Sequence, residues 1–336
     1  MKNLIFLLGL LALLFWSSCE TDFTLEGEWK DIPVVYSFLS EQDTAHYVRV
    51  QRAFLEPGGN AVEIAQNPDS IYYKADEITV TLQNGNNTVE LTRVDGTAEG
   101  YPREGGDFAT TPNILYKASK ADADLSGGDI AQLSIMRNDE ITAEATITMV
   151  EKISFSFLPL NGLAVGRNYS SANNSIDFLP EGDEASVFDV RMIFRYNEPD
   201  PNNPSARVVR EVVWVLAESL ARDEDTNTQR YTYSGESFYQ FLGDAIDPID
   251  DGNRQFEEIF YEVTAAGSEI GAYLDISSAN IGITSAQAVP IYSNVDGGVG
   301  VVSSRYTVRS SSVGLNSESR DSLFNGFYTR DLNFVP

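Results

Sequence analysis

Cys19 is the only cysteine in the chain, and its position points to lipid chemistry. It follows a leader in which Lys2 precedes an apolar run over residues 4–16 and two small serines. This order is typical of a secretory signal peptide, and the run is shorter than the roughly 20 apolar residues of a membrane-spanning helix. We therefore expect residues 1–18 to be a lipoprotein signal peptide and Cys19 to become the acylated, palmitate-bearing N-terminus that anchors the chain to a membrane.

His46 is the only histidine, and this excludes several classes of active site. Catalytic triads need a histidine with partners placed around it, and zinc sites built from cysteine and histidine need more of both residues. General acid–base chemistry is then left to carboxylate pairs, and the 50 aspartates and glutamates are too numerous for spacing to nominate one pair. We predict that the chain is not an enzyme and needs no cofactor. A carboxylate-dependent glycosidase is the remaining enzymatic alternative.

One acidic segment approaches the spacing of a calcium-binding loop. Asp247, Asp251 and Glu258 stand at the first, fifth and twelfth positions of an EF-hand pattern, with Gly252 at the sixth. The third position is Ile249, whose side chain cannot ligate a cation. Two interpretations stay open here: a calcium site at these carboxylates, and a charged loop that precedes a strand.

Composition limits the possible partners. The 336 residues carry a formal net charge of −27 at pH 7, and such a surface repels nucleic acid, which is therefore excluded as a ligand. With 42% hydrophobic and 11% aromatic residues, the chain has the composition of a folded protein. Acidic residues crowd the stretch that follows the cysteine, and we interpret residues 19–30 as an acidic, solvated tether.

Short segments with a period of two follow the tether. Residues 84–87 are a hairpin turn signal between expected strands at 78–82 and 89–94. The other strands that we expect in this part are at 33–39, 46–55, 129–136 and 141–149. Short strands at this spacing predict a mainly β fold that begins with an Ig-like β-sandwich domain over residues 31–150.

Residues 151–336 predict a second β-rich domain with one or two short helices. Apolar side chains share one face of a helix expected over residues 237–246, with Ser237 as its N-cap. A second short helix is expected over residues 269–276. The expected strands of this domain are at 153–159, 187–196, 208–218, 256–264, 290–293 and 299–308.

The connections in this second half carry their own signals. Residues 166–185 are expected to form a polar connector, and the three prolines of residues 197–204 predict a solvent-exposed loop. The glycines of residues 297–300 predict a tight turn or a bulge within a β region. We consider residues 197–204 and 290–300 as candidate partner-facing surfaces.

Several segments together resemble a known family. They are residues 34–39, 43–50, 68–73, 78–82, 141–146 and 291–300. The chain resembles an uncharacterised family of Bacteroidota outer-membrane lipoproteins that are commonly encoded beside TonB-dependent transporters. The resemblance implies that the protein is an outer-membrane lipoprotein, at the cell surface or on the periplasmic face, and a binding or accessory subunit of a TonB-dependent transporter barrel. A surface adhesion or structural lipoprotein without a transporter is the alternative.

Two shorter resemblances accompany this one. The acidic residues that follow Cys19 resemble the surface-export signal of Bacteroidota lipoproteins. Thr44, Ser70 and Ser322 each follow an aspartate and precede an apolar residue, which resembles the sites that Bacteroidota O-glycosylate on exported proteins. Glycosylation requires exposure, and we expect these three residues to lie in polar turns or in the C-terminal tail.

Overall fold

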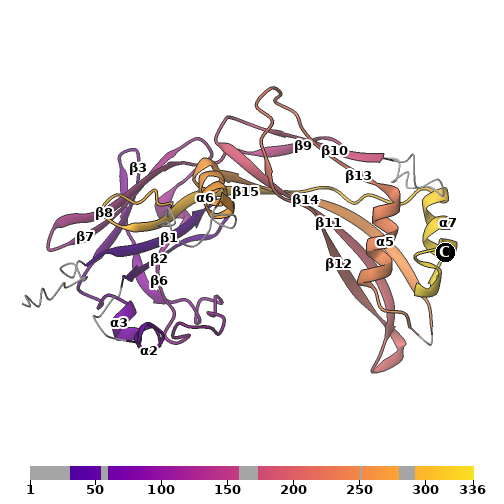
Figure 1. Cartoon of the computed structure of the whole chain (residues 1–336), viewed down its shortest axis with the longest axis horizontal. Coiled ribbons are helices and arrows are strands. Elements are labelled where there is room, and N and C mark those ends of the chain that lie inside the picture. Colours follow the sequence, from indigo (N-terminus) through magenta and orange to yellow (C-terminus); the bar gives the residue numbers. More distant parts are fainter. Residues whose placement is uncertain (1–30, 54–59, 159–172, 250–251, 280–291) are drawn as a thin grey trace, which may run out of the picture.

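The computed structural model describes residues 31–53, 60–158, 173–249, 252–279 and 292–336. The expected signal peptide, Cys19 and the acidic tether lie outside these residues. Figure 1 shows two β-rich bodies at opposite ends of an arch, with α6 (Ser268–Ala279) beside their junction. Among the helices of the described residues, none is long and apolar enough to cross a membrane.

The N-terminal body is a β-sandwich, as predicted. One layer holds β1 (Pro33–Leu39), β2 (Ala45–Arg52), β5 (Thr92–Asp95) and β6 (Ile114–Ser119). The other holds β3 (Thr79–Asn84), β4 (Asn87–Glu90), β7 (Ile130–Arg137) and β8 (Glu140–Thr148), in the order β4-β3-β7-β8. Alternate side chains of both layers, such as Val35, Val48, Leu82 and Leu133, form the buried core between them.

The predicted hairpin at residues 84–87 is confirmed, but the strand that follows it divides in two. Asn84 pairs with Asn87 across the turn, and Gly85 adopts the positive φ of 55° that this turn requires. The expected strand 89–94 is broken at Leu91, which is buried in the core. The residues before Leu91 belong to β4 in one layer and those after it belong to β5 in the other, because the buried leucine turns the chain from one layer to the next.

The second body is also mainly β, with α5 (Gly235–Ala245) and α7 (Ser317–Asn325) at its far end and α6 near the junction (Figure 1). Its strands are β9 (Ile153–Phe157), β10 (Asn173–Pro180), β11 (Ala185–Asp200), β12 (Asn203–Ala221), β13 (Gln229–Ser234), β14 (Arg254–Gly267), β15 (Val299–Arg309) and β16 (Phe334–Val335). Strands β13, β10 and β9 form one sheet, and β12, β11 and β14 continue into the nine-stranded sheet that also holds β1. The helices are α5, α6, α7 and the 3-10 turn η2 (Arg330–Leu332).

Strand β15 belongs to both bodies. Its first half pairs in parallel with β1, from Val34–Val299 to Leu39–Ser304, and its second half pairs antiparallel with β14. Val295 and Val302 accordingly lie in the core of the N-terminal sandwich. The core of the N-terminal sandwich therefore includes residues from beyond the division expected at residue 150, and the assignment of all of residues 151–336 to the second domain needs correction. A period of two identifies a strand without identifying its neighbours.

Three expectations about the second half are wrong in detail. The connector expected at 166–185 contains β10, and the loop expected at 197–204 is reduced to a turn, because β11 continues to Asp200 and β12 begins at Asn203. Pro199 lies beyond the last β11–β14 pair, where β11 has one neighbouring strand and tolerates proline as an edge strand does. The N-cap of α5 is Ser234, whose side chain accepts a hydrogen bond from the Ser237 backbone N–H.

Candidate ligand-binding pocket

The outer face of the first sandwich layer, which points away from the sandwich core, carries polar and aromatic side chains. Strand β1 turns Val35 into the core and Tyr36 to the opposite face. Strand β2 does the same with Val50 and Arg49. Neighbouring side chains of two strands are therefore presented together on the side of the sheet that faces away from the sandwich core.

This outer face is covered by the segments between β2 and β6. Two short helices, α2 (Ala61–Ala65) and α3 (Pro68–Ile71), lie below the sheet in Figure 1. The side chain of Asn60 caps α2, that of Asn67 caps α3, and proline begins α3, which is the preferred chemistry of helix starts. The Gln66 side chain donates to the carbonyl oxygens of Gly106 and Asp107, which ties these helices to the loop between β5 and β6.

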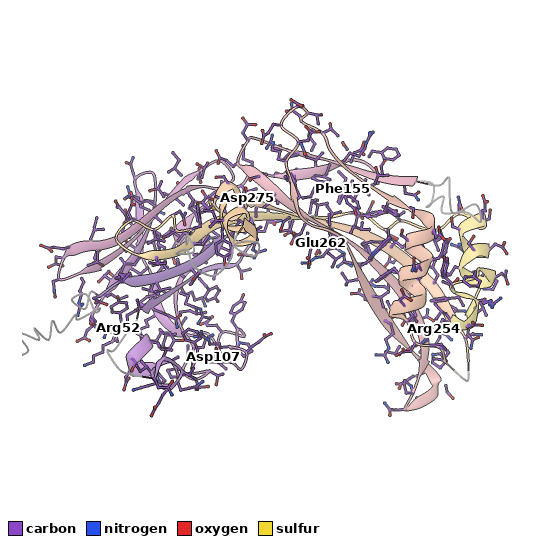
Figure 2. All side chains as sticks on the ribbon, in the orientation of Figure 1. Arg52, Asp107, Phe155, Arg254, Glu262 and Asp275 are labelled. Carbon is purple, nitrogen blue, oxygen red and sulfur yellow. The ribbon has the colours of Figure 1, made fainter. Side chains whose placement is uncertain are left out.

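A pocket of about 450 Å³ lies between the outer face of the sheet and this cover. Arg52 and Asp107 mark this end of the molecule in Figure 2. We name it the arginine pocket, and it is lined by Val34, Tyr36, Arg49, Gln51, Arg52, Ala53, Ile71, Arg103 and Phe108. No acidic residue is among them, although the chain carries more than twice as many acidic as basic residues.

Arg52 is neutralised by carboxylates at the edge of the pocket. It donates to Glu77 at 2.6 Å and lies 3.8 Å from Asp31. Arg137 bonds to the same two carboxylates, so two guanidinium groups share two acids. Burial raises the pKa of Glu77, but the Lys74 backbone N–H and the two arginines outweigh it and lower the pKa overall. The two arginines and the two carboxylates therefore form a structural network whose charges cancel.

Arg49 and Arg103 lack such compensation: neither forms an ion pair with any carboxylate of the described residues. Arg103 donates to the Tyr72 hydroxyl at 3.3 Å, and its guanidinium carbon lies 4.6 Å from the centroid of the Phe108 ring. Burial lowers the pKa of Arg49, Tyr72 partly opposes this, and the positive charge of Arg103 lowers it further. Two half-buried positive charges therefore face one another across the Tyr72 hydroxyl.

Three donors of the pocket residues also lack hydrogen-bond partners. Arg49 Nη1, Gln51 Nε2 and Arg52 Nε are shielded from solvent and have no hydrogen-bond acceptor in the described part of the chain, although Arg52 Nε lies 3.8 Å from Asp31. A buried donor without an acceptor costs about 1–3 kcal/mol. A buried group without a partner calls for an explanation, and the pocket beside Arg49 and Gln51 offers one, an acceptor from outside the chain.

The residues expected to bind calcium are not brought together as a cation site. Glu258 lies in β14 and accepts a hydrogen bond from Arg195 at 2.8 Å, because the two residues pair directly across the β11–β14 ladder. Asp251 lies outside the described residues, and Asp247 follows α5. Within the residues that the structure describes, no group of three or more histidine, cysteine, aspartate or glutamate side chains could hold a metal ion.

The three expected glycosylation residues differ in exposure. Thr44 is exposed just before β2, and Ser70 is half-buried within α3. Ser322 is 0% exposed and donates its hydroxyl to the Glu318 carbonyl oxygen within α7. The expectation that Ser322 lies in an accessible tail is therefore wrong, because α7 packs its polar side chains against the body of the protein.

Two further sequence candidates have structural roles. His46 lies in β2, is 1% exposed, and has no hydrogen-bond partner for either ring nitrogen in the described residues. In the expected partner-facing segment 290–300, the described residues from 292 onward pack against the sandwich. Asp296 forms a backbone bridge with Glu144, and Asn294 bonds to both backbone groups of Val302. This segment closes the edge of the sandwich.

The arginine pocket was not predicted from the sequence. The alternation of residues 46–55 does place Arg49 and Gln51 on one face of β2, and this is a usable signal for a polar outer face. Arg103 lies 54 residues further along the chain in a loop, and no periodicity connects it with Arg49. The fold of the segment between β5 and β6 alone brings the two charges together.

The described residues thus define a mainly β protein built on a β-sandwich. No protein-family model matches the sequence, and no curated protein matches it significantly. Among solved structures, a crystal structure of the FN1–FN3 domains of chicken CNTN1 matches with 9% identity and a TM-score of 0.22. The match covers 71% of this chain and 62% of that chain, so it spans less than two thirds of the other protein's length. The fold assignment therefore rests on the strand order of this chain and not on this match.

Proposed function

We propose that the protein is an outer-membrane lipoprotein that binds a small ligand in the arginine pocket and serves as an accessory subunit of a TonB-dependent transporter. The single observation that carries the binding role is the pocket itself. It is preformed, holds two arginines without carboxylate partners among the described residues, and contains buried donors without acceptors there. Its volume falls within the range of small-molecule sites, about 300–1,000 Å³.

The membrane address and the partner rest on the sequence. The leader over residues 1–18 and the cysteine that follows it support acylation at Cys19. The segments that resemble the Bacteroidota lipoprotein family support a transporter barrel as the partner. In this arrangement the tether holds the ligand-binding body close to the mouth of a transporter.

Three carboxyl groups with shifted pKa values do not fit the general acid of a glycosidase, and this favours binding without chemical conversion. A glycosidase needs one carboxyl group that stays protonated because its pKa is raised. Burial raises the pKa of Glu77 and of Glu198, but their arginine partners outweigh burial and both pKa values are lowered. The pKa of Glu99 is also lowered, by hydrogen bonds from Lys117 and Tyr47. These carboxylates have the electrostatics of ion-pair members.

A surface adhesion role is the second candidate, and one observation favours it. Strand β12 is the outer strand of the nine-stranded sheet, and Val209, Val213 and Val215 are exposed along its face. An outer strand offers backbone donors and acceptors to a strand of another protein. A surface adhesin would bind another protein through β12 and would need neither a transporter nor the arginine pocket.

Affinity capture of the full-length chain from detergent-solubilised envelopes tests the proposed function. We expect a TonB-dependent barrel to co-purify with the wild-type protein, and Cys19→Ser to leave the membrane fraction. Protease treatment of intact cells then determines which face of the outer membrane the body occupies. Capture of a matrix or host protein without any barrel supports the adhesion role instead, and an unmodified Cys19 in mass spectrometry refutes the lipoprotein assignment.

A further inference from the structure

The ligand class can be argued from the chemistry of the pocket walls, given the binding role proposed above. We propose that the arginine pocket binds an amphipathic organic anion whose carboxylate or phosphate group is held by Arg49 and Arg103. An apolar, ring-bearing body of the same ligand would pack against Tyr36, Ile71 and Phe108. The shared chemistry of the two anionic groups is a planar or tetrahedral set of oxygen acceptors.

The positive charge of the pocket is the first argument for an anionic ligand. Both guanidinium groups lie near the Tyr72 hydroxyl, and their positive charges repel each other. An anion that binds in the pocket beside both groups offsets this repulsion and forms charge-assisted hydrogen bonds with both. None of the described residues that line the pocket is an acid that would compete with it.

The unpartnered donors support an acceptor-rich ligand group. Arg49 Nη1 and Gln51 Nε2 belong to side chains on the same face of β2, two residues apart, and neither has an acceptor in the described residues. A carboxylate offers about four lone-pair directions on two oxygens, which is enough for both donors and for Arg103 once a side-chain rotation turns the two shielded donors toward the pocket. A neutral hydroxyl or amide offers fewer acceptors and no charge.

The apolar walls require more than a bare anion. Val34, Tyr36, Ile71 and Phe108 line the same pocket, and Tyr36 and Phe108 are 43% and 37% exposed. The volume of about 450 Å³ exceeds what inorganic phosphate fills. Exposed rings beside arginines are suited to stacking against a planar apolar group. The ligand is therefore amphipathic, with its charge at the strand β2 side and its body at the aromatic side.

Titration calorimetry of the full-length, detergent-solubilised protein tests this assignment with three probes of one shape. They are 2-naphthoate, 2-naphthyl phosphate and the neutral 2-naphthamide. We expect at least one anion to bind about 10-fold more tightly than the amide, since hydrogen bonds to charged groups contribute at least this factor. Preference for naphthoate indicates a carboxylate ligand, and preference for the phosphate indicates a phosphate ester. Equal binding of all three probes, or binding of none, overturns the proposal.

Variants test whether the preference for the anion depends on the two arginines. We expect R49Q combined with R103Q to abolish the preference for the anion, and R191Q, which removes an exposed arginine of the second body, to leave it unchanged. Retention of the preference in the double variant overturns the proposal. If the double variant does not fold, R103Q alone carries the test, because Arg103 lies in a loop outside the strands.

The same variants separate this inference from the transporter role. We expect the double variant to retain Cys19 acylation and to capture the barrel as the wild type does. Loss of anion preference with barrel capture intact supports both proposals. Anion binding without any captured barrel refutes the transporter role and supports the ligand class. Barrel capture without anion binding supports the transporter role and refutes the ligand class.

Discussion

The hydroxyl of Ser304 donates to the carbonyl oxygen of Thr148 at 3.1 Å, which joins the end of β8 to the middle of β15. The same hydroxyl oxygen accepts from the Val150 backbone N–H at 2.8 Å. Ser304 is fully buried at the point where β15 leaves β1 and where the chain leaves the N-terminal sandwich. One side chain therefore satisfies the backbone at the junction of the two bodies.

We expect Ser304→Ala to destabilise the protein by about 1–3 kcal/mol, because the Val150 N–H and the Thr148 carbonyl are left buried without partners. Urea unfolding monitored by tryptophan fluorescence measures the change. Ser312 is exposed and three residues beyond β15, so Ser312→Ala is the matched control and should change stability by less than about 0.5 kcal/mol. Equal stability of the two variants would show that the junction does not depend on this side chain.

Gly300 of β15 pairs with Val35 of β1 and leaves no room for a Cβ atom. It has a φ of 138°, and a Cβ there would lie 1.9 Å from the Val35 carbonyl oxygen. We expect Gly300→Ala to cost about 3 kcal/mol or more, from the strained backbone and the displaced strand together. A Cβ at Gly314 would have no described atom within 4 Å, so Gly314→Ala should be nearly neutral. The midpoint of thermal unfolding distinguishes the two, and similar midpoints would contradict the close approach.

Much of the strand pattern was predictable, and the pairing of β15 was not. Alternating side chains identified β2 and β8, and apolar or β-branched residues beside turn signals identified β1, β7 and β15. Nothing in residues 299–309 indicates that the first half joins β1 and the second half joins β14. The connection between distant strands depends on long-range packing, which local periodicity does not encode.

Helix α5 shows a similar limit at the level of single residues. The amphipathic pattern identified the helix, but both Ser234 and Ser237 are acceptable N-caps by residue type. We expect Ser234→Ala to cost about 1 kcal/mol, because the Ser237 backbone N–H loses its acceptor. Ser237→Ala should cost less, since its backbone N–H keeps that acceptor. Urea midpoints that rank the two variants in the opposite order would place the cap at Ser237.

His46 should make the stability of the protein sensitive to mild acid. Burial lowers its pKa in the folded chain, Asp43 partly opposes this, and Lys120 lowers it further, while the ordinary value is 6.5. As the pH falls below 6.5, the unfolded chain takes up a proton that the folded chain resists, so the free energy of unfolding decreases. The slope is at most about 1.4 kcal/mol per pH unit for one proton.

The variant His46→Leu isolates this contribution from the many carboxylates. It removes the titrating group and the two buried nitrogens that have no partner among the described residues, so we expect its stability to change less between about pH 7.5 and pH 5.5 than that of the wild type. Urea unfolding at the two pH values measures both differences. The same decrease in both proteins would assign the acid sensitivity to groups other than His46.

The opposite roles of Arg49 and Arg52 can be separated by stability measurements without any ligand. Arg52→Met leaves Asp31 and Glu77 with one arginine in place of two, so we expect a loss of about 1–3 kcal/mol. Arg49→Met removes a half-buried charge that has no carboxylate partner among the described residues and is repelled by Arg103, so we expect unchanged or higher stability. Residues kept for binding typically cost stability in this way, and residues of a structural ion pair do not. Thermal unfolding of the two variants decides the point, and a destabilised Arg49→Met protein would assign Arg49 to the structure of the fold.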